Sequence, residues 1–313
     1  MSGVAAEAAA PTPIAWRQIA AITAAAVAVF AFLRWLPTGT NLSHMDFRAT
    51  GANSIEFCDP LNPQFISVVA VRSPVTMTIS AAPVGGAGQE VRAVVTLRTA
   101  SGKAIAPEDL LITHTRRLHL LLIDPSLTDY QHVHPEPGEK PGEWRFAFTP
   151  QRPGVYRVFA DFTPAATARG LYASVDWNAG AASGDAGTAP RDSNPVVERD
   201  GFRFSLATGG SPLRAGQPID LSFAIVRPDG AAVPMEPVMG AYAHLVAFDE
   251  GRNGFAHLHP IELDPLQRPD AQLPLLKFKL TIPQPGRYVV WAQINLGGRE
   301  VFVPFWITVE PAA

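Results

Sequence analysis

Histidine is the residue type whose spacing in this chain points most directly to chemistry. Of the 8 histidines, six form two triplets that share the spacing H-x12-H-x-H-P. The triplets are His119, His132 and His134 in the first half of the chain and His244, His257 and His259 in the second. Three imidazoles with no thiolate nearby suit Cu(II) or Zn(II). The sequence therefore predicts a metal site at each triplet, for divalent copper or zinc.

A β-hairpin is the element that must position each triplet. Residues two apart in a strand point to the same face, so His132 and His134 are expected to lie side by side. A turn-like segment, residues 124–130, separates them from His119. If His119 lies opposite either of them in the hairpin, all three imidazoles share one face. A register shift of one residue would move His119 to the other face. The second triplet follows the same rules.

The triplet histidines have a structural alternative, and two other histidines and one carboxylate fall outside the triplets. A structural role is the alternative for all six triplet histidines, since a duplicated domain keeps histidines that cap turns or hydrogen-bond a neighbouring strand. His44 and His114 fall outside the triplets and are expected to be ordinary surface or tether residues. Asp161 occupies the place that Gln293 holds in the second copy. We expect a solvated strand residue there; support of the first metal site, with unequal affinities, is the alternative.

A duplicated β domain is the unit that carries the triplets. The segment 153–160 (PGVYRVFA) corresponds to 285–292 (PGRYVVWA), and Gly102 corresponds to Gly230. Short segments rich in β-branched residues, bounded by turns that draw on 25 glycines and 30 prolines, are typical of antiparallel sandwiches. The sequence therefore predicts an all-β body of two tandem Ig-like or cupredoxin-like sandwiches, at residues 65–180 and 196–313. Residues 181–195 form the linker between them.

One apolar segment, residues 14–36, precedes this body. Trp16 and Trp35 flank it, and Arg17 and Arg34 lie where they can reach out to the membrane surfaces. A cleaved signal peptide is the alternative, but no small-x-small cleavage site follows the apolar core. We expect an uncleaved single-pass anchor, with residues 1–13 as a tail and 37–64 as a tether. A long domain after a lone N-terminal anchor is usually translocated, so the body is expected outside the cytoplasm.

Charge, cysteine content and motifs exclude several classes of protein. A formal net charge of −3 does not favour nucleic-acid binding. The single cysteine, Cys58, excludes an intrachain disulfide framework and lies far from both triplets, so a blue-copper site is not expected. The chain contains no G-x-S-x-G, P-loop or H-E-x-x-H motif. We therefore expect a protein that is not an enzyme.

The residues that follow each first histidine resemble a family of bacterial envelope proteins. The window from His119 to Pro135 with the 153–160 strand, and its repeat from His244 to Pro260 with 285–292, are similar to YtkA-like and CopC-like copper-resistance domains. The resemblance implies Ig-like or cupredoxin-like sandwiches, a place in the cell envelope and a connection with copper.

These observations together favour a metal-binding protein anchored in the bacterial inner membrane, with its body in the periplasm. Sequestration or delivery of copper is the expected role, with envelope proteins of metal trafficking as partners. A non-catalytic adhesion or assembly module with structural histidines is the second hypothesis. A zinc hydrolase is the third, because three histidines and an open water position resemble catalytic zinc.

Overall fold

A computed structural model of the chain describes residues 15–35, 42–48, 63–70, 73–81, 87–180, 194–210, 212–261 and 267–313. The chain divides into two compact units, Met1–Asn41 and Leu42–Ala313, and each is described by itself. Four features of the sequence analysis lie outside the described residues: the tail 1–13, most of the tether 37–64, Cys58 within it and most of the linker 181–195.

The first unit contains one helix, α1 (Trp16–Trp35). Its residues are apolar on all sides and carry no acidic group. The span Trp16–Arg34 has a mean hydropathy of 1.7 and is long enough to cross a membrane. An anchor and a signal sequence both have these properties.

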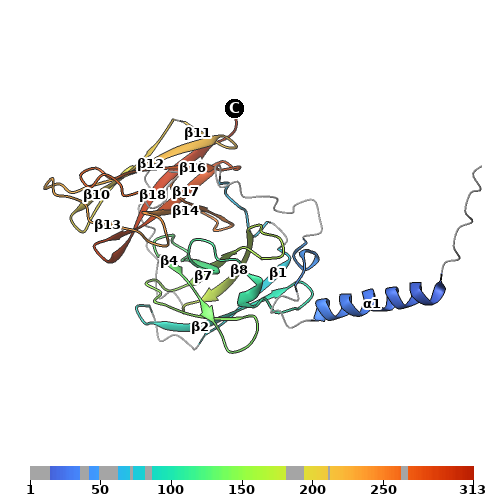
Figure 1. Cartoon of the computed structure of the whole chain (residues 1–313). Coiled ribbons are helices and arrows are strands. Elements are labelled where there is room, and N and C mark those ends of the chain that lie inside the picture. Colours follow the sequence, from blue (N-terminus) through green and yellow to red (C-terminus); the bar gives the residue numbers. More distant parts are fainter. Residues whose placement is uncertain are drawn as a thin grey trace, which may run out of the picture. The chain divides into compact units, whose positions relative to one another are not determined.

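The first sandwich consists of two four-stranded antiparallel sheets (Figure 1). One sheet has the order β1-β2-β6-β5, with β1 (Val75–Ala81), β2 (Val91–Thr99), β6 (Glu143–Phe148) and β5 (Glu136–Pro137). The other has the order β4-β3-β7-β8, with β4 (Tyr130–Val133), β3 (Leu118–Ile123), β7 (Val155–Phe162) and β8 (Leu171–Asn178). Two short 3-10 helices, η1 (His44–Phe47) and η2 (Pro107–Asp109), contribute buried residues at its margins.

The second sandwich repeats this plan in the later part of the chain, coloured yellow to red in Figure 1. One sheet has the order β16-β12-β10-β9, with β16 (Leu275–Thr281), β12 (Pro218–Val226), β10 (Phe202–Thr208) and β9 (Val196–Arg199). The other has the order β11-β18-β17-β14-β15, with β13 also paired to β17. Its strands are β11 (Leu213–Arg214), β18 (Arg299–Glu310), β17 (Gly286–Leu296), β14 (His244–Asp249), β15 (Phe255–Leu258) and β13 (Met235–Glu236). The predicted fold class is therefore confirmed: all-β sandwiches preceded by one apolar helix.

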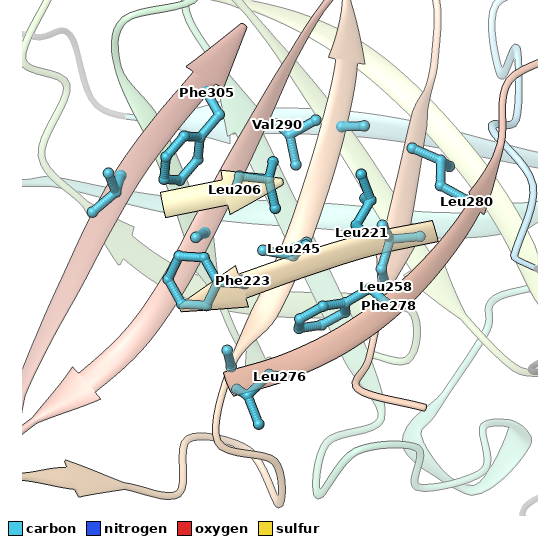
Figure 2. Packing of buried hydrophobic residues seen from close by; sticks show 14 of the residues in the cluster. Leu206, Leu221, Phe223, Leu245, Leu258, Leu276, Phe278, Leu280, Val290 and Phe305 are labelled. Atoms are coloured by element: carbon cyan, nitrogen blue, oxygen red, sulfur yellow. The ribbon is translucent and has the colours of Figure 1, made fainter. Parts of the chain in front are cut away.

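Each sandwich has its own apolar core because its strands alternate. In the second sandwich, Phe223 of β12, Leu245 of β14 and Phe305 of β18 meet between the two sheets (Figure 2). In the first, Leu120 and Leu122 of β3 pack with Trp144 of β6. Side chains of opposite parity on the same strands must then face away from these cores.

A third apolar cluster lies between the two sandwiches. It joins Leu121 and Phe159 of the first sandwich to Val246, Phe248 and Trp291 of the second. The central strands β3 and β14 are therefore covered on both faces, and all six residues of β3 are buried. Leu121 and Val246 therefore belong to neither core and lie in this shared layer.

One segment ahead of the first sandwich belongs to the second. Phe65 lies in the core of the second sandwich, where its ring meets Tyr288 edge to face at 5.2 Å. The backbone of Phe65 donates to the carbonyl of Thr281 at 2.9 Å, and Ile66 pairs with Phe255. Phe47, in contrast, is buried in the core of the first sandwich. The boundaries drawn from the sequence stay predictions, but residue 65 packs with the second sandwich.

Candidate metal centre

Two equivalent hairpins hold the triplets. In the first, β3 pairs with β4 so that Leu121 lies opposite His132, and continuing this register places His119 opposite His134. In the second, Val246 lies opposite His257. This is one of the two registers that allow all three histidines of a triplet to share a face.

An aspartate fixes the turn of each hairpin. The Asp124 carboxylate accepts hydrogen bonds from the backbone N–H groups of Thr128 and Asp129 at 2.7 and 2.8 Å. The Asp249 carboxylate accepts from those of Asn253 and Gly254 at 2.7 and 3.0 Å. These side chains hold the loop length and therefore the register that brings the histidines together.

The structure brings all six predicted residues into two compact groups. Each imidazole offers one nitrogen, and within a triplet these nitrogens lie within 4.8 Å of one another. His119 and His244 are buried, with 1% and 0% of their surface exposed. Each triplet thus has the composition and the compactness of a three-imidazole site.

Hydrogen bonds fix the tautomers of the first triplet. Nε2 of His119 lies 3.0 Å from the carbonyl of Thr113, which can only accept, so Nε2 carries the proton. The amide of Gln293 donates to the Glu300 carboxylate at 2.8 Å, so its oxygen faces His132 and accepts from Nδ1 at 2.9 Å. His119 Nδ1 and His132 Nε2 then both carry lone pairs. These two nitrogens face each other at 3.2 Å.

The second triplet repeats the arrangement. Nε2 of His244 donates to the carbonyl of Val238 at 2.9 Å. Nδ1 of His257 donates to the Asp161 carboxylate at 3.1 Å. The remaining nitrogens, His244 Nδ1 and His257 Nε2, lie 3.3 Å apart. Two facing lone pairs repel each other unless a cation lies between them.

The third histidine of each triplet has a buried nitrogen without a partner. Nε2 of His134 and Nε2 of His259 are buried and make no hydrogen bond. Buried polar atoms of this kind are uncommon in folded proteins and call for an explanation. A metal ion that takes this nitrogen as its third ligand would provide one.

The nitrogen separations fit such an ion. Two imidazoles bound tetrahedrally at a metal–nitrogen distance of about 2.0–2.1 Å place their nitrogens roughly 3.3–3.4 Å apart. The observed 3.2 and 3.3 Å agree with this separation. One pair of imidazole nitrogens in each triplet therefore has the separation that a bound ion requires, and the third imidazole offers a nitrogen within 4.8 Å of them.

Burial keeps the imidazoles neutral. Desolvation lowers the pKa of His134 and of His244 to about 3. It also lowers the pKa values of His132, His257 and His259 well below 6.5, with neighbouring imidazoles adding to the effect. Neutral imidazole is the form that ligates metals, so the folded protein presents its ligands ready to bind near neutral pH.

The two triplets form one cluster across the junction of the sandwiches. The rings of His132 and His257 lie 5.2 Å apart, and those of His119 and His257 lie 5.7 Å apart. The hydrogen bonds cross the junction as well, because Gln293 serves His132 while Asp161 serves His257. Each half of the chain therefore orients one ligand of the other half's triplet.

Two residues that we expected to be ordinary belong to this cluster. His114 stacks on His259 with ring centroids 3.5 Å apart, so this exposed residue is part of the cluster. Asp161 is not a solvated strand residue: its carboxylate accepts a hydrogen bond from His257 of the second triplet, and on β7 it lies opposite His119 of the first. Burial raises the pKa of Asp161, while the imidazoles of His119 and His114 oppose that rise. His44 is exposed, as expected.

The position of His114 has a local cause that the spacing did not reveal. His114 and Thr115 have φ values of 49° and 69°, the conformation of a type I′ turn between Thr113 and Arg116. Met239 and Gly240 adopt the same turn in the second copy, with φ values of 51° and 80°. The repeat alone does not identify His114, because the equivalent position in the second copy is Met239.

Solved structures offer only distant likenesses. The Escherichia coli adhesin FdeC is 15% identical, with 76% of this chain and 64% of that chain covered and a TM-score of 0.24. A protein of Corynebacterium diphtheriae described as membrane anchored is 10% identical, with coverages of 76% and 59% and a TM-score of 0.23. The alpha-2-macroglobulin of Escherichia coli is 17% identical, with coverages of 76% and 14% and a TM-score of 0.24. The chain spans less than two thirds of each of these proteins, and TM-scores this low support no argument about function.

Comparison with protein families gives a firmer result. A search of curated proteins found no match. One family model, described as Domain of unknown function (DUF8832), matches residues 70–177 and 196–311. The matched segments cover most of the chain and coincide with the two sandwiches. The chain therefore belongs to the DUF8832 family.

Proposed function

We propose that this protein binds two metal ions, one at each histidine triplet, for sequestration or delivery in the cell envelope. One observation carries the proposal. In each triplet two deprotonated imidazole nitrogens face each other at 3.2 or 3.3 Å, beside a third buried nitrogen that has no partner. A bound cation satisfies all three nitrogens at once.

Copper is proposed ahead of zinc. Divalent copper binds a given nitrogen site more tightly than zinc in the general affinity order of first-row metals. The nitrogen separations of 3.2 and 3.3 Å match tetrahedral coordination, which zinc prefers, whereas divalent copper prefers square-planar or tetragonal sites. The geometry therefore keeps zinc as the alternative. The resemblance to YtkA-like and CopC-like domains supports copper and envelope trafficking partners.

The proposed location is the bacterial inner membrane, with the body in the periplasm. The apolar helix α1 supports a single-pass anchor. Alkaline carbonate washing of membranes should leave the full-length protein in the pellet. A soluble product that begins near residue 38 would identify α1 as a cleaved signal instead.

We propose binding rather than catalysis. The carboxylate in the cluster, Asp161, accepts a hydrogen bond from His257 Nδ1 and supports a ligand instead of facing an open coordination position. Ester or phosphoester turnover by the zinc-loaded protein would favour the hydrolase hypothesis.

Metal uptake by the full chain in detergent micelles tests the proposal. The protein is stripped with a chelator, equilibrated with Cu²⁺ or Zn²⁺, and its metal content is measured by mass spectrometry. We expect about two ions per chain. His134→Ala and His259→Ala should each remove one ion, because each loses a ligand that makes no other hydrogen bond.

His44→Ala is the matched control, since His44 is an exposed histidine outside the cluster. It should retain two ions. Failure of the stripped protein to take up copper or zinc beyond the His134→Ala/His259→Ala double variant would overturn the proposal. If these variants instead lost thermal stability in the presence of chelator, the histidines would be structural, as an adhesion or assembly module requires.

A further inference from the structure

We infer that the two triplets are unequal sites of one centre, and that the second triplet fills first and binds its divalent ion more tightly. This inference rests on the proposed function. It adds an order of filling, and it assigns Asp161 as the positioning residue that sets that order.

The middle histidine of each triplet donates its Nδ1–H to a different kind of acceptor. Nδ1 of His257 donates to a carboxylate, Asp161, whereas Nδ1 of His132 donates to a neutral amide, Gln293. A carboxylate behind a ligating imidazole orients the ring and raises its basicity, and losing such a partner typically lowers metal affinity about 10–100-fold. The second triplet has this support and the first does not.

The two acceptors also differ in charge. Asp161 brings a negative charge to the second triplet, and its side chain is only 21% exposed. Gln293 brings no charge to the first triplet, because an amide is neutral. Its NH2 group donates to the Glu300 carboxylate, so that carboxylate does not contact His132 directly. A divalent cation is therefore neutralised in part at the second site, where solvent screens little of the attraction.

The two sites lie close together. The rings of His132 and His257, one from each triplet, lie 5.2 Å apart in the buried cluster. Two divalent ions held by these rings repel each other, so the ion that binds first weakens the binding of the next. Filling is therefore sequential, and the first ion takes the site with the carboxylate.

A further imidazole lies at the second site. The exposed ring of His114 stacks on His259 with centroids 3.5 Å apart. Met239 occupies the equivalent turn position in the second copy. One ligand of the second triplet is therefore held in place by a stacked imidazole, and the equivalent residue of the other copy offers none.

Single-site variants of the full chain in detergent test this order. His134→Ala leaves the second site and His259→Ala leaves the first, and each is titrated with Cu²⁺ against a competing chelator. The site that remains in His134→Ala should bind about 10–100-fold more tightly than the one that remains in His259→Ala. Asp161→Asn should remove most of this advantage in the His134→Ala background. It should lower the affinity by a smaller factor in the His259→Ala background, where Asp161 lies opposite His119 while its hydrogen bond goes to His257 of the other site.

A reciprocal exchange keeps the test independent of the Asp161 variant. Gln293→Glu combined with Glu300→Gln moves a carboxylate behind His132 without placing two carboxylates together. In the His259→Ala background this pair should tighten Cu²⁺ binding. The Cu²⁺ electron paramagnetic resonance spectrum should shift with Asp161→Asn while still showing nitrogen ligation, a change that a merely structural role would not produce.

The outcomes separate this inference from the proposed function. If no variant binds Cu²⁺, the proposed function itself fails. If both sites bind with equal affinity and Asp161→Asn has no effect on either, the metal sites stand and the inference of unequal filling is wrong.

Discussion

At the scale of single residues, the buried imidazoles make the metal-free protein sensitive to acid. The pKa values of His134 and His244 fall to about 3 in the folded state, against about 6.5 for an unperturbed histidine. The unfolded chain therefore binds more protons than the folded chain between pH 6.5 and pH 3. Stability is greatest above pH 6.5 and decreases as the pH falls through this window.

Chemical denaturation of chelator-treated protein across this pH range checks the prediction. Each such histidine contributes a slope of about 1.4 kcal/mol per pH unit to the free energy of unfolding. His134→Ala should therefore give a shallower pH dependence than the unaltered protein. A free energy of unfolding that stays constant from pH 6.5 to pH 4 would contradict the neutral, buried state of these imidazoles.

The six histidines of the two triplets could be predicted from the sequence, but the other residues of the cluster, His114 and Asp161, could not. Six histidines at repeated spacing identify the triplets without help from the fold. His114 and Asp161 have no spacing that links them to the second triplet, since His114 reaches it through a turn and Asp161 lies on β7, a strand of the other sandwich. Contacts across the junction leave no periodic signal in the chain.

At the scale of elements, β3 and β14 each support two apolar layers. Leu121→Ala and Val246→Ala should each destabilise the body by about 2–4 kcal/mol, because each opens a cavity in the shared cluster. Leu275→Ala is the control, since 48% of the Leu275 surface is exposed, and it should change the free energy of unfolding by less than about 0.5 kcal/mol. Urea denaturation of the three variants provides the comparison. Equal effects at all three positions would mean that the shared layer contributes nothing to stability.

The hairpins were predictable for a physical reason. Their turns are local, and alternation fixes which face each strand presents, so only two registers placed the three histidines of a triplet together. The layer between the sandwiches was not predictable in the same way. The strand Leu118–Ile123 is apolar at every position except His119, which indicates burial on both faces but does not identify what covers the second face.

At the scale of the whole molecule, the two sandwiches share buried surface, so we expect the second sandwich to be less stable alone. A fragment of residues 194–313 loses Phe65 from its core and exposes the shared cluster, including Val246, Phe248 and Trp291. We expect it to melt below the unaltered body and to bind a hydrophobic dye. Calorimetry and dye fluorescence of the fragment and the body, compared at one protein concentration, measure this. A fragment that melted at the same temperature without binding dye would show that the second sandwich is self-sufficient after all.

The position of Phe65 in the second core also constrains the order in which the chain acquires its structure during synthesis. Its backbone partner, Thr281, is made roughly 200 residues later, which corresponds to about 10–40 s at ordinary rates of translation. During that interval the core that buries Phe65 does not yet exist, while all strands of the first sandwich have been made. A segment made early is thus among the last to reach its native partners, because the second core closes only after β16, β17 and β18 have been synthesised.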